Sequence, residues 1–333
     1  MMNKRLKQGS TFLLAVALTF PLLTLPGARA ANAIETDRKC SVSFSVSGEG
    51  NELTAADTDI KVNLYKVADV DVSGNYTATK DFTGLNVSSV SADDKDAAAS
   101  EWADRAKEAQ KMLKESVEPT ATVTLAKGIG SKDGLATGLY LVDTPEVVTT
   151  NYTYTFTPYL VSLPTNNYYS NGNDTWIYDL TDTNAIGLKP EEHARYGDLK
   201  INKTLANHNA TTGKKATFVF KIEITPLKGK TETRIESLDF EAAGDSSVTI
   251  TKIPAGAKVK VTEVYSGASY KLTSANDQTA TIVATDRGST NTPASVSFTN
   301  DIDDNMNGGY GVKNNFKLDE NGQYQYTEPA EKN

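Results

Sequence analysis

The sequence predicts a mainly β protein with two tandem β-sandwich domains, the first carrying an inserted α-helix. From Cys40 onward most segments alternate apolar and polar residues and are rich in Val, Thr, Ile and Tyr, which is typical of half-buried strands. Turn signals separate these segments, among them Ser73-Gly74-Asn75 and Pro254-Ala255-Gly256. The length of 333 residues suits about two domains.

The charge balance and the scarcity of His and Cys exclude several classes of protein. The chain has 34 basic and 42 acidic residues, a formal net charge of −8. A nucleic-acid-binding protein needs basic patches, so this balance argues against one. Two His and one Cys leave little for a metal site and allow no disulfide within one molecule. We therefore expect no metal, no cofactor and no nucleic-acid partner.

Residues 1–30 have the order of a secretory signal peptide. Lys4, Arg5 and Lys7 precede an apolar run over residues 12–25, and small residues around Arg29 follow it. The run is shorter than the ~20 residues of a membrane span, and no second apolar run follows. We expect cleavage after Ala30, no membrane span in the mature chain, and a secreted, extracellular location at the cell surface.

The first domain is predicted to cover residues 31–190 and to contain a helix over 92–116. Ser91 and Asp94 form an S-x-x-D cap. An apolar stripe with helical spacing follows, made of Ala98, Trp102, Ala106, Ala109 and Leu113. We expect Trp102 to lie in the core, where the helix packs on the sandwich.

Cys40 opens the first strand of this domain. It shares the alternation phase of Val42, Phe44 and Val46, which are apolar. The residues before it lack the small apolar run of a lipid-attachment site. A buried, inert thiol is therefore predicted.

A short linker over residues 189–197 is predicted to separate the domains, because Pro, Glu and Gly interrupt the strand pattern there. The second β-sandwich domain is predicted over 197–302. Residues 303–333 are predicted to form a C-terminal linker, rich in Gly and Asn, and a β-hairpin around Asn321-Gly322.

Three polar residues of the second domain occupy positions that should face its core. Along a strand the side chains alternate between faces, so the apolar residues identify the inward phase. The strand LKINKTL places Lys203 on its apolar face, KVKVTEV places Glu263 there, and ASVSFTN places Asn300 there. Each would cost several kcal/mol if buried without a partner.

Two interpretations of this trio remain open. Burial lowers the pKa of an amine and raises that of a carboxylic acid, so Lys203 could attack the Asn300 carboxamide while Glu263 transfers protons. The product would be a Lys203–Asn300 isopeptide bond. Alternatively, Lys203 and Glu263 form a buried salt bridge, with Asn300 hydrogen-bonded to both.

The order of motifs in the second domain resembles a known family. LKINKTL, FVFKIEI, IPAGAKVKVTEV and VSFTND follow one another over about a hundred residues, as in the pilin isopeptide-linkage domain of Gram-positive surface proteins. The domain is similar to the C-terminal half of the streptococcal backbone pilin. This resemblance implies an Ig-like (CnaB-like) fold and a spontaneous cross-link between Lys203 and Asn300, with Glu263 as the catalytic residue.

The first domain is similar, more loosely, to the N-terminal domains of sortase-assembled pilins. The segments IKVNLYKVADV, GLATGLYLV, YLVSLP and WIYDL carry this similarity. The domain departs from doubly cross-linked pilins because its opening strand offers no inward Lys. Lys66 shares an inward phase but lies at a strand end, where its amine can reach solvent.

Surface attachment is the least specified property. The chain ends in YTEPAEKN without an L-P-x-T-G signal. Lys189 stands where a pilin-motif lysine would follow the strand at Trp176, so it is a candidate sortase acceptor; the alternative is a solvated linker lysine.

Two functions are compatible with these features. The first is a structural, pilin- or fimbrial-type surface protein hardened by one isopeptide bond, whose partners are other surface or pilus subunits. The second is an adhesin, whose first domain binds a host protein or glycan while the second domain is a stiff stalk. In either case the protein is not an enzyme, because the cross-link forms once within each molecule.

Overall fold

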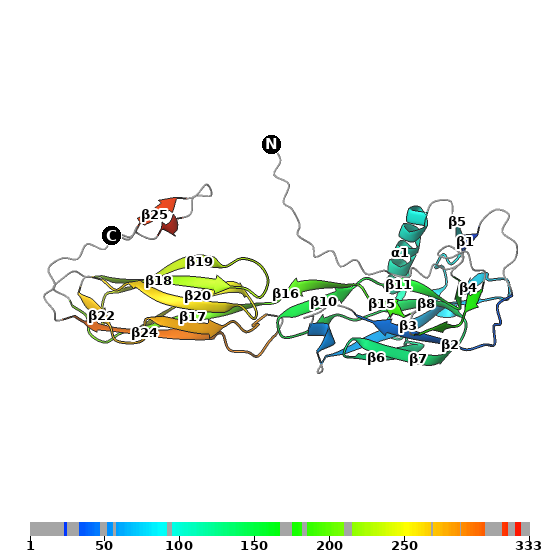
Figure 1. Cartoon of the computed structure of the whole chain (residues 1–333), viewed down its shortest axis with the longest axis horizontal. Helices are drawn as coiled ribbons and strands as arrows, with labels where there is room; N and C mark the ends of the chain where they lie inside the picture. The colour runs from blue at the N-terminus through cyan, green and yellow to red at the C-terminus, as the bar shows by residue number, and fades with distance from the viewer. Residues whose placement is uncertain are drawn as a thin grey trace. The chain divides into compact units, whose positions relative to one another are not determined.

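The computed structural model describes residues 23–24, 33–46, 52–55, 58–91, 95–166, 175–181, 185–209, 215–267, 269–286, 288–303, 315–318 and 324–327. The chain divides into two compact units. Unit 1 comprises residues 1–149 and 153–193, and unit 2 comprises residues 150–152 and 194–333. The predicted fold class is confirmed, because strands dominate both units and the described residues include a single α-helix (Figure 1).

Most of the predicted signal peptide, including its cleavage site, lies outside the described residues. Two of its residues form the short strand β1 (Leu23–Thr24), which pairs in parallel with β5 (Val90–Ser91). Within the described ranges, no helix combines the length and the apolar character that crossing a membrane requires.

A nine-stranded sheet forms the body of unit 1. Its main path runs in the order β11 (Tyr159–Leu163), β8 (Gly138–Asp143), β3 (Asp59–Val70), β6 (Ala121–Ala126), β7 (Ile129–Leu135), β2 (Cys40–Ser45) and β14 (Asp179–Leu180). Two short strands join it: β4 (Tyr76–Ala78) pairs with β3, and β15 (Ile186–Gly187) pairs with β2. Cys40, Val42 and Phe44 of β2 are all fully buried, which matches their shared phase in the sequence.

The helix α1 (Lys95–Met112) packs against β8 and β11 of this sheet (Figure 1). Its buried apolar residues are Ala98, Trp102, Ala106 and Ala109, four members of the apolar stripe that the sequence contains. Leu113 follows the last helical residue, so the helix is shorter than the predicted range 92–116. Ser91 belongs to β5, and Asp94 lies outside the described residues, so the predicted cap cannot be described.

The segment predicted as a linker, residues 189–197, is largely strand. β16 (Pro190–Ala194) lies in a three-stranded sheet beside β10 (Tyr152–Phe156), which also pairs with β9 (Val147–Val148). Pro190 is the first residue of its strand, where a missing N–H is tolerated. The remaining short elements of unit 1 are η1 (Glu52–Thr54), η2 (Lys80–Phe82), and the paired strands β12 (Thr165–Asn166) and β13 (Trp176–Ile177).

Unit 2 contains a sandwich of two four-stranded sheets. One sheet has the order β20 (Gly244–Pro254), β17 (Tyr196–Leu205), β24 (Ala294–Ile302) and β22 (Tyr270–Leu272). The other has the order β19 (Glu232–Phe240), β18 (Ala216–Thr225), β21 (Lys258–Tyr265) and β23 (Asp277–Thr281). The alternating residues of these strands meet between the sheets as one apolar core.

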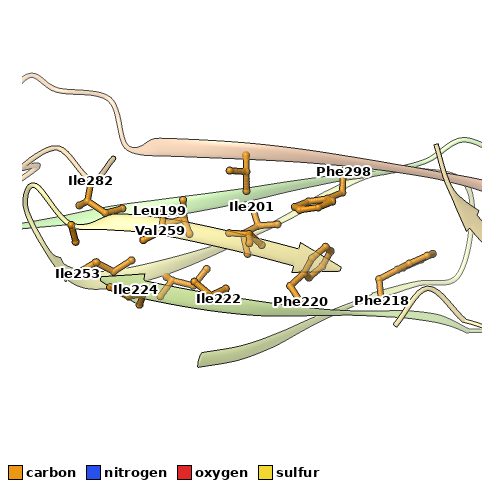
Figure 2. Packing of buried hydrophobic residues seen from close by; sticks show 14 of the residues in the cluster. Leu199, Ile201, Phe218, Phe220, Ile222, Ile224, Ile253, Val259, Ile282 and Phe298 are labelled. Atoms are coloured by element: carbon orange, nitrogen blue, oxygen red, sulfur yellow. The ribbon is translucent and has the colours of Figure 1, made fainter. Parts of the chain in front are cut away.

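In the core, side chains from the two sheets pack against one another (Figure 2). Leu199, Ile201 and Phe298 point from β17 and β24 toward Phe220 and its neighbours on the facing sheet. The ring centres of Phe220 and Phe298 lie 5.2 Å apart. The first strand of the sandwich, β17, pairs in parallel with its last strand, β24, so that residue 203 lies opposite Phe298 and Leu205 opposite residue 300.

A separate two-stranded sheet lies near the C-terminus. β25 (Asn315–Leu318) and β26 (Tyr324–Thr327) pair antiparallel. The turn predicted at Asn321-Gly322 falls outside the described residues.

Candidate functional site

Regular alternation along β17 and β24 turns two polar side chains into the sandwich. Lys203 follows Leu199 and Ile201 on the inward face and is only 1% exposed. Asn300 follows Phe298 on the inward face of β24 and has no exposed surface. Since these strands are paired in parallel, the two residues reach the core at the same end of one sheet.

The facing sheet supplies the third polar group. Glu263 lies on β21, opposite Phe220 of β18, and is 5% exposed. The sandwich therefore brings together the three residues that the sequence places at inward phases, two from one sheet and one from the other.

The contacts within the trio are mutual. Lys203 Nζ contacts Asn300 Oδ1 and lies 3.1 Å from Glu263 Oε2. Asn300 Nδ2 donates a hydrogen bond of 2.6 Å to Glu263 Oε1. Each side chain thus contacts both of the others, and the amine, the carboxamide and the carboxyl group form one closed cluster.

The surroundings are largely apolar and aromatic. Lys203 Nζ lies 4.3 Å from the centre of the Phe218 ring, an attractive position for a cation. Phe218 in turn contacts Phe240 and Tyr270, with ring centres 5.6 Å apart in both pairs. Burial here lowers the pKa of the Lys203 amine below its ordinary value, and the neighbouring Glu263 partly offsets this.

The two oxygens of Glu263 differ in their partners. Oε1 accepts hydrogen bonds from Asn300 and from the Ser266 hydroxyl. Oε2 is buried and accepts no hydrogen bond of good geometry, although it lies close to Lys203 Nζ. Of the two oxygens, Oε2 is therefore the one open to a proton from Lys203.

Ser266 and Asn276 also belong to this site, and neither was predicted from the sequence. Asn276 Oδ1 accepts a hydrogen bond of 3.0 Å from the backbone N–H of Glu263. Strict alternation from Glu263 would turn Ser266 outward, so the strand pattern held no signal for it. Asn276 lies in the turn before β23, and its contact depends on tertiary structure alone.

Neither of the other two lysines considered from the sequence joins such a cluster. Lys66 lies 2.5 Å from the exposed Asp69, in an ion pair on the same strand. Lys189 is exposed and follows β15. Within the described ranges, no group of three or more His, Cys, Asp or Glu side chains is arranged to hold a metal ion.

Comparison with sequence families gives one match. A family described as a domain of unknown function (DUF5979) matches residues 199–303, a span that includes Lys203, Glu263 and Asn300. No curated protein matches the chain significantly.

Solved structures of Gram-positive surface proteins are similar to the chain at low identity. A streptococcal ancillary pilin is 11% identical, with 79% of this chain and 69% of that chain covered and a TM-score of 0.26. The minor pilin GBS52 of Streptococcus agalactiae is also 11% identical, with 82% and 100% covered and a TM-score of 0.23. The fimbrial protein FimP of Actinomyces oris is 12% identical, with 72% and 64% covered and a TM-score of 0.28.

Proposed function

We propose that the chain is a structural surface protein of the pilin or fimbrial type, hardened by an isopeptide bond between Lys203 and Asn300. One observation carries this proposal: an amine, a carboxamide and a carboxyl group are buried together in a core that otherwise excludes charge. If the cluster formed only a salt bridge, the attraction between its charges would offset little more than the free energy needed to bury them. As the precursor of a neutral amide it removes the buried charge.

The reaction needs no group from outside the trio. Lys203 passes a proton to Glu263, and the neutral amine attacks Asn300 Cγ, forming the new C–N bond. Glu263 then protonates Nδ2, the Cγ–Nδ2 bond breaks and ammonia leaves. Glu263 takes the surplus proton from the Lys203 nitrogen and keeps it, so it ends as a neutral carboxylic acid. The sum is one ammonia lost and one amide gained, and neither buried group is charged at the end.

The bond would stabilise the sandwich by limiting its unfolded state. Lys203 and Asn300 are 97 residues apart. For a loop of this length the chain-entropy model, developed for disulfides, gives roughly 4 to 5 kcal/mol. A covalent link between the first and last strands also suits a protein that carries tension, because hydrogen bonds between strands would no longer bear it alone.

The intact mass of the mature, fully denatured chain tests the bond. We expect the wild-type chain to be lighter than its calculated mass by one ammonia, about 17 Da. The Glu263→Ala chain should have its full calculated mass. A wild-type chain at full mass would show that the trio is only a polar network, and the proposed function would lose its main support.

Export and assembly complete this proposal. Residues 1–30 would direct secretion, and other pilus or surface subunits would be the partners. Lys189 would be the acceptor if a sortase joins the chain to another subunit, since it is exposed. Incubation with a sortase and a sorting-signal peptide donor should add the mass of one peptide to the chain, and the loss of this adduct in Lys189→Ala tests the role. An adduct that persists in the variant would exclude Lys189.

An adhesin is the second candidate, and one surface feature favours it. An open groove of about 490 Å³ runs beside α1, lined by polar side chains including Asn86, Ser100, Glu101, Asp104 and Glu108. Carboxylates and amides of this kind accept hydrogen bonds from sugar hydroxyls. Binding of the full chain to immobilised glycans or host proteins, lost in Asp104→Ala/Glu108→Ala, would support adhesion. Equal binding by both chains would exclude the groove.

A further inference from the structure

One hydrogen bond to the candidate catalytic group comes from outside the trio. The hydroxyl of Ser266 donates to Glu263 Oε1 over 2.6 Å. The same oxygen accepts the Asn300 Nδ2 hydrogen bond, also over 2.6 Å. Oε1 is therefore held between two donors, while Oε2 is left to Lys203.

A β-bulge explains why Ser266 reaches this oxygen. Phe220 of β18 pairs with Glu263, but Val219, its neighbour, pairs with Tyr265, so Val264 is an extra residue in β21. The extra residue shifts the alternation by one position. Ser266, which a regular strand would turn outward, thereby shares the inward side of Glu263.

The turn that follows is also specific. Gly267 has a φ of +74°, a left-handed conformation that favours glycine. A Cβ atom there would lie 3.2 Å from Cδ2 of Tyr270, the aromatic residue that packs on Phe218. The chain thus turns directly after Ser266, where it lies against Tyr270, one of the aromatic residues around the site.

The proposed reaction asks two different things of the Glu263 carboxyl group. Oε2 must take a proton from the Lys203 nitrogen and pass it to the Asn300 nitrogen once the new C–N bond has brought both nitrogens onto one carbon. Oε1 meanwhile holds the Asn300 nitrogen through its hydrogen bond. The two oxygens can play these separate roles only if the carboxyl group keeps its orientation. Rotation about the Cγ–Cδ bond of Glu263 would break this correspondence.

We propose that Ser266 is a positioning residue, whose hydroxyl keeps Glu263 Oε1 on the leaving nitrogen of Asn300 and Oε2 on the amine of Lys203. This inference rests on the proposed isopeptide bond and assigns a fourth residue to its formation. Ser266 forms no bond to the reacting atoms. Its effect is therefore on the rate of cross-linking, and the product of the reaction is unchanged.

The test measures how fast the cross-link forms in the full chain. Unreacted chain, recovered in urea and identified by its full mass, is diluted into buffer, and samples are quenched in acid for intact mass. Ser266→Ala should form the bond about tenfold more slowly than wild type, the effect of one hydrogen bond to a charged group. Ser266→Thr keeps the hydroxyl and should restore most of the rate. Ser295→Ala, an exposed serine on β24, is the matched control and should react at the wild-type rate.

A second measurement separates positioning from folding. Ser266→Ala and Ser266→Thr are each combined with Asn300→Ala, which cannot cross-link, and their thermal unfolding is compared. Positioning predicts similar unfolding temperatures together with different rates. Equal rates for wild type and Ser266→Ala would overturn the inference but leave the proposed function intact, as would slow bond formation explained by a matching loss of stability. If wild type itself never loses ammonia, the proposed function fails first.

Discussion

At the scale of single residues, Lys203 is costly to the folded state, because its ionisable side chain has no exposed surface. Its amine is opposed by one carboxylate and lies over one aromatic ring. If the amide cannot form, the folded chain keeps an amine that is more easily deprotonated than the same amine in water. Variants that block the reaction should therefore reveal this penalty as a dependence of stability on pH.

The Asn300→Ala chain tests this dependence. The lowered pKa of Lys203 means that the unfolded state binds more protons than the folded state between that lowered value and 10.5, so stability rises with pH in this window. We expect the unfolding free energy of Asn300→Ala, relative to Lys203→Met/Asn300→Ala, to increase by up to about 1.4 kcal/mol per pH unit. Denaturant titrations of both chains at several pH values measure it. A constant difference over the window would contradict the burial of a titrating amine.

Cys40 provides an independent check in unit 1. Its thiol is buried, and burial raises its pKa to about 11, so both access and thiolate formation are suppressed. Alkylation by iodoacetamide at neutral pH should be at least ~100-fold slower in the native chain than in denaturant, because only opened molecules react. Mass spectrometry gives the modified fraction. Rapid alkylation without denaturant would mean that the Cys40 thiol is accessible, and this would contradict its buried position on β2.

At the scale of elements, α1 packs on its sheet mainly through one large side chain. Its buried stripe is made of three alanines and one large residue, Trp102, which is 4% exposed. The guanidinium of Arg105 lies 4.5 Å from the Trp102 ring and donates to the Ser88 carbonyl. Trp102 is therefore the main apolar contact of this helix with the sheet.

Removing that contact should loosen unit 1. Trp102→Ala is expected to lower the unfolding free energy by about 3 to 5 kcal/mol, the usual cost of truncating a buried aromatic side chain. Lys107→Ala, on the exposed face of the same helix, should change it by less than about 0.5 kcal/mol. Denaturant unfolding followed by circular dichroism distinguishes the two. Equal effects would show that the helix contributes little to the stability of its unit.

The regular strands are also the part of the molecule that the sequence predicts best. Alternation places Lys203, Glu263 and Asn300 inward because β17, β21 and β24 are regular up to those residues. One residue beyond Glu263 the bulge breaks this regularity, and a strict period of two then assigns Ser266 to the wrong face.

Elements that depend on distant partners were less predictable. The segment that forms β16 was predicted to be part of a linker, because Pro and Glu residues interrupt the strand pattern there. It is a strand because β10, far away in the sequence, offers it hydrogen-bonding groups. Likewise the chain after Trp176 forms the separate short strands β13, β14 and β15, whose partners lie in two different sheets.

At the scale of the whole molecule, both units pair an early strand in parallel with a late one. In unit 1, β2 pairs with β14 and β15, and in unit 2, β17 pairs with β24. The described part of β2 offers no inward lysine, so hydrogen bonds and side-chain packing alone hold that pairing. The proposed covalent bond would make unit 2 respond to force in a different way.

Stretching single molecules should reveal this difference. With the Lys203–Asn300 bond intact, the 97-residue separation between these residues cannot open under load. The Glu263→Ala chain should show an additional extension of roughly 320 to 350 Å when unit 2 unfolds, from the length of an extended chain. The wild-type chain should lack this step and retain the extension of unit 1. The same step in both chains would exclude a load-bearing bond.

The position of Asn300 on the last strand of the sandwich also governs when the bond can form. A ribosome makes Lys203 long before Asn300, and the core that buries both needs β24 in place. A nascent or prematurely terminated chain therefore holds the amine without its target and stays free to unfold. Only a sandwich that has been synthesised to its final strand could form the proposed bond, so the cross-link would act as a chemical record that synthesis had passed β24.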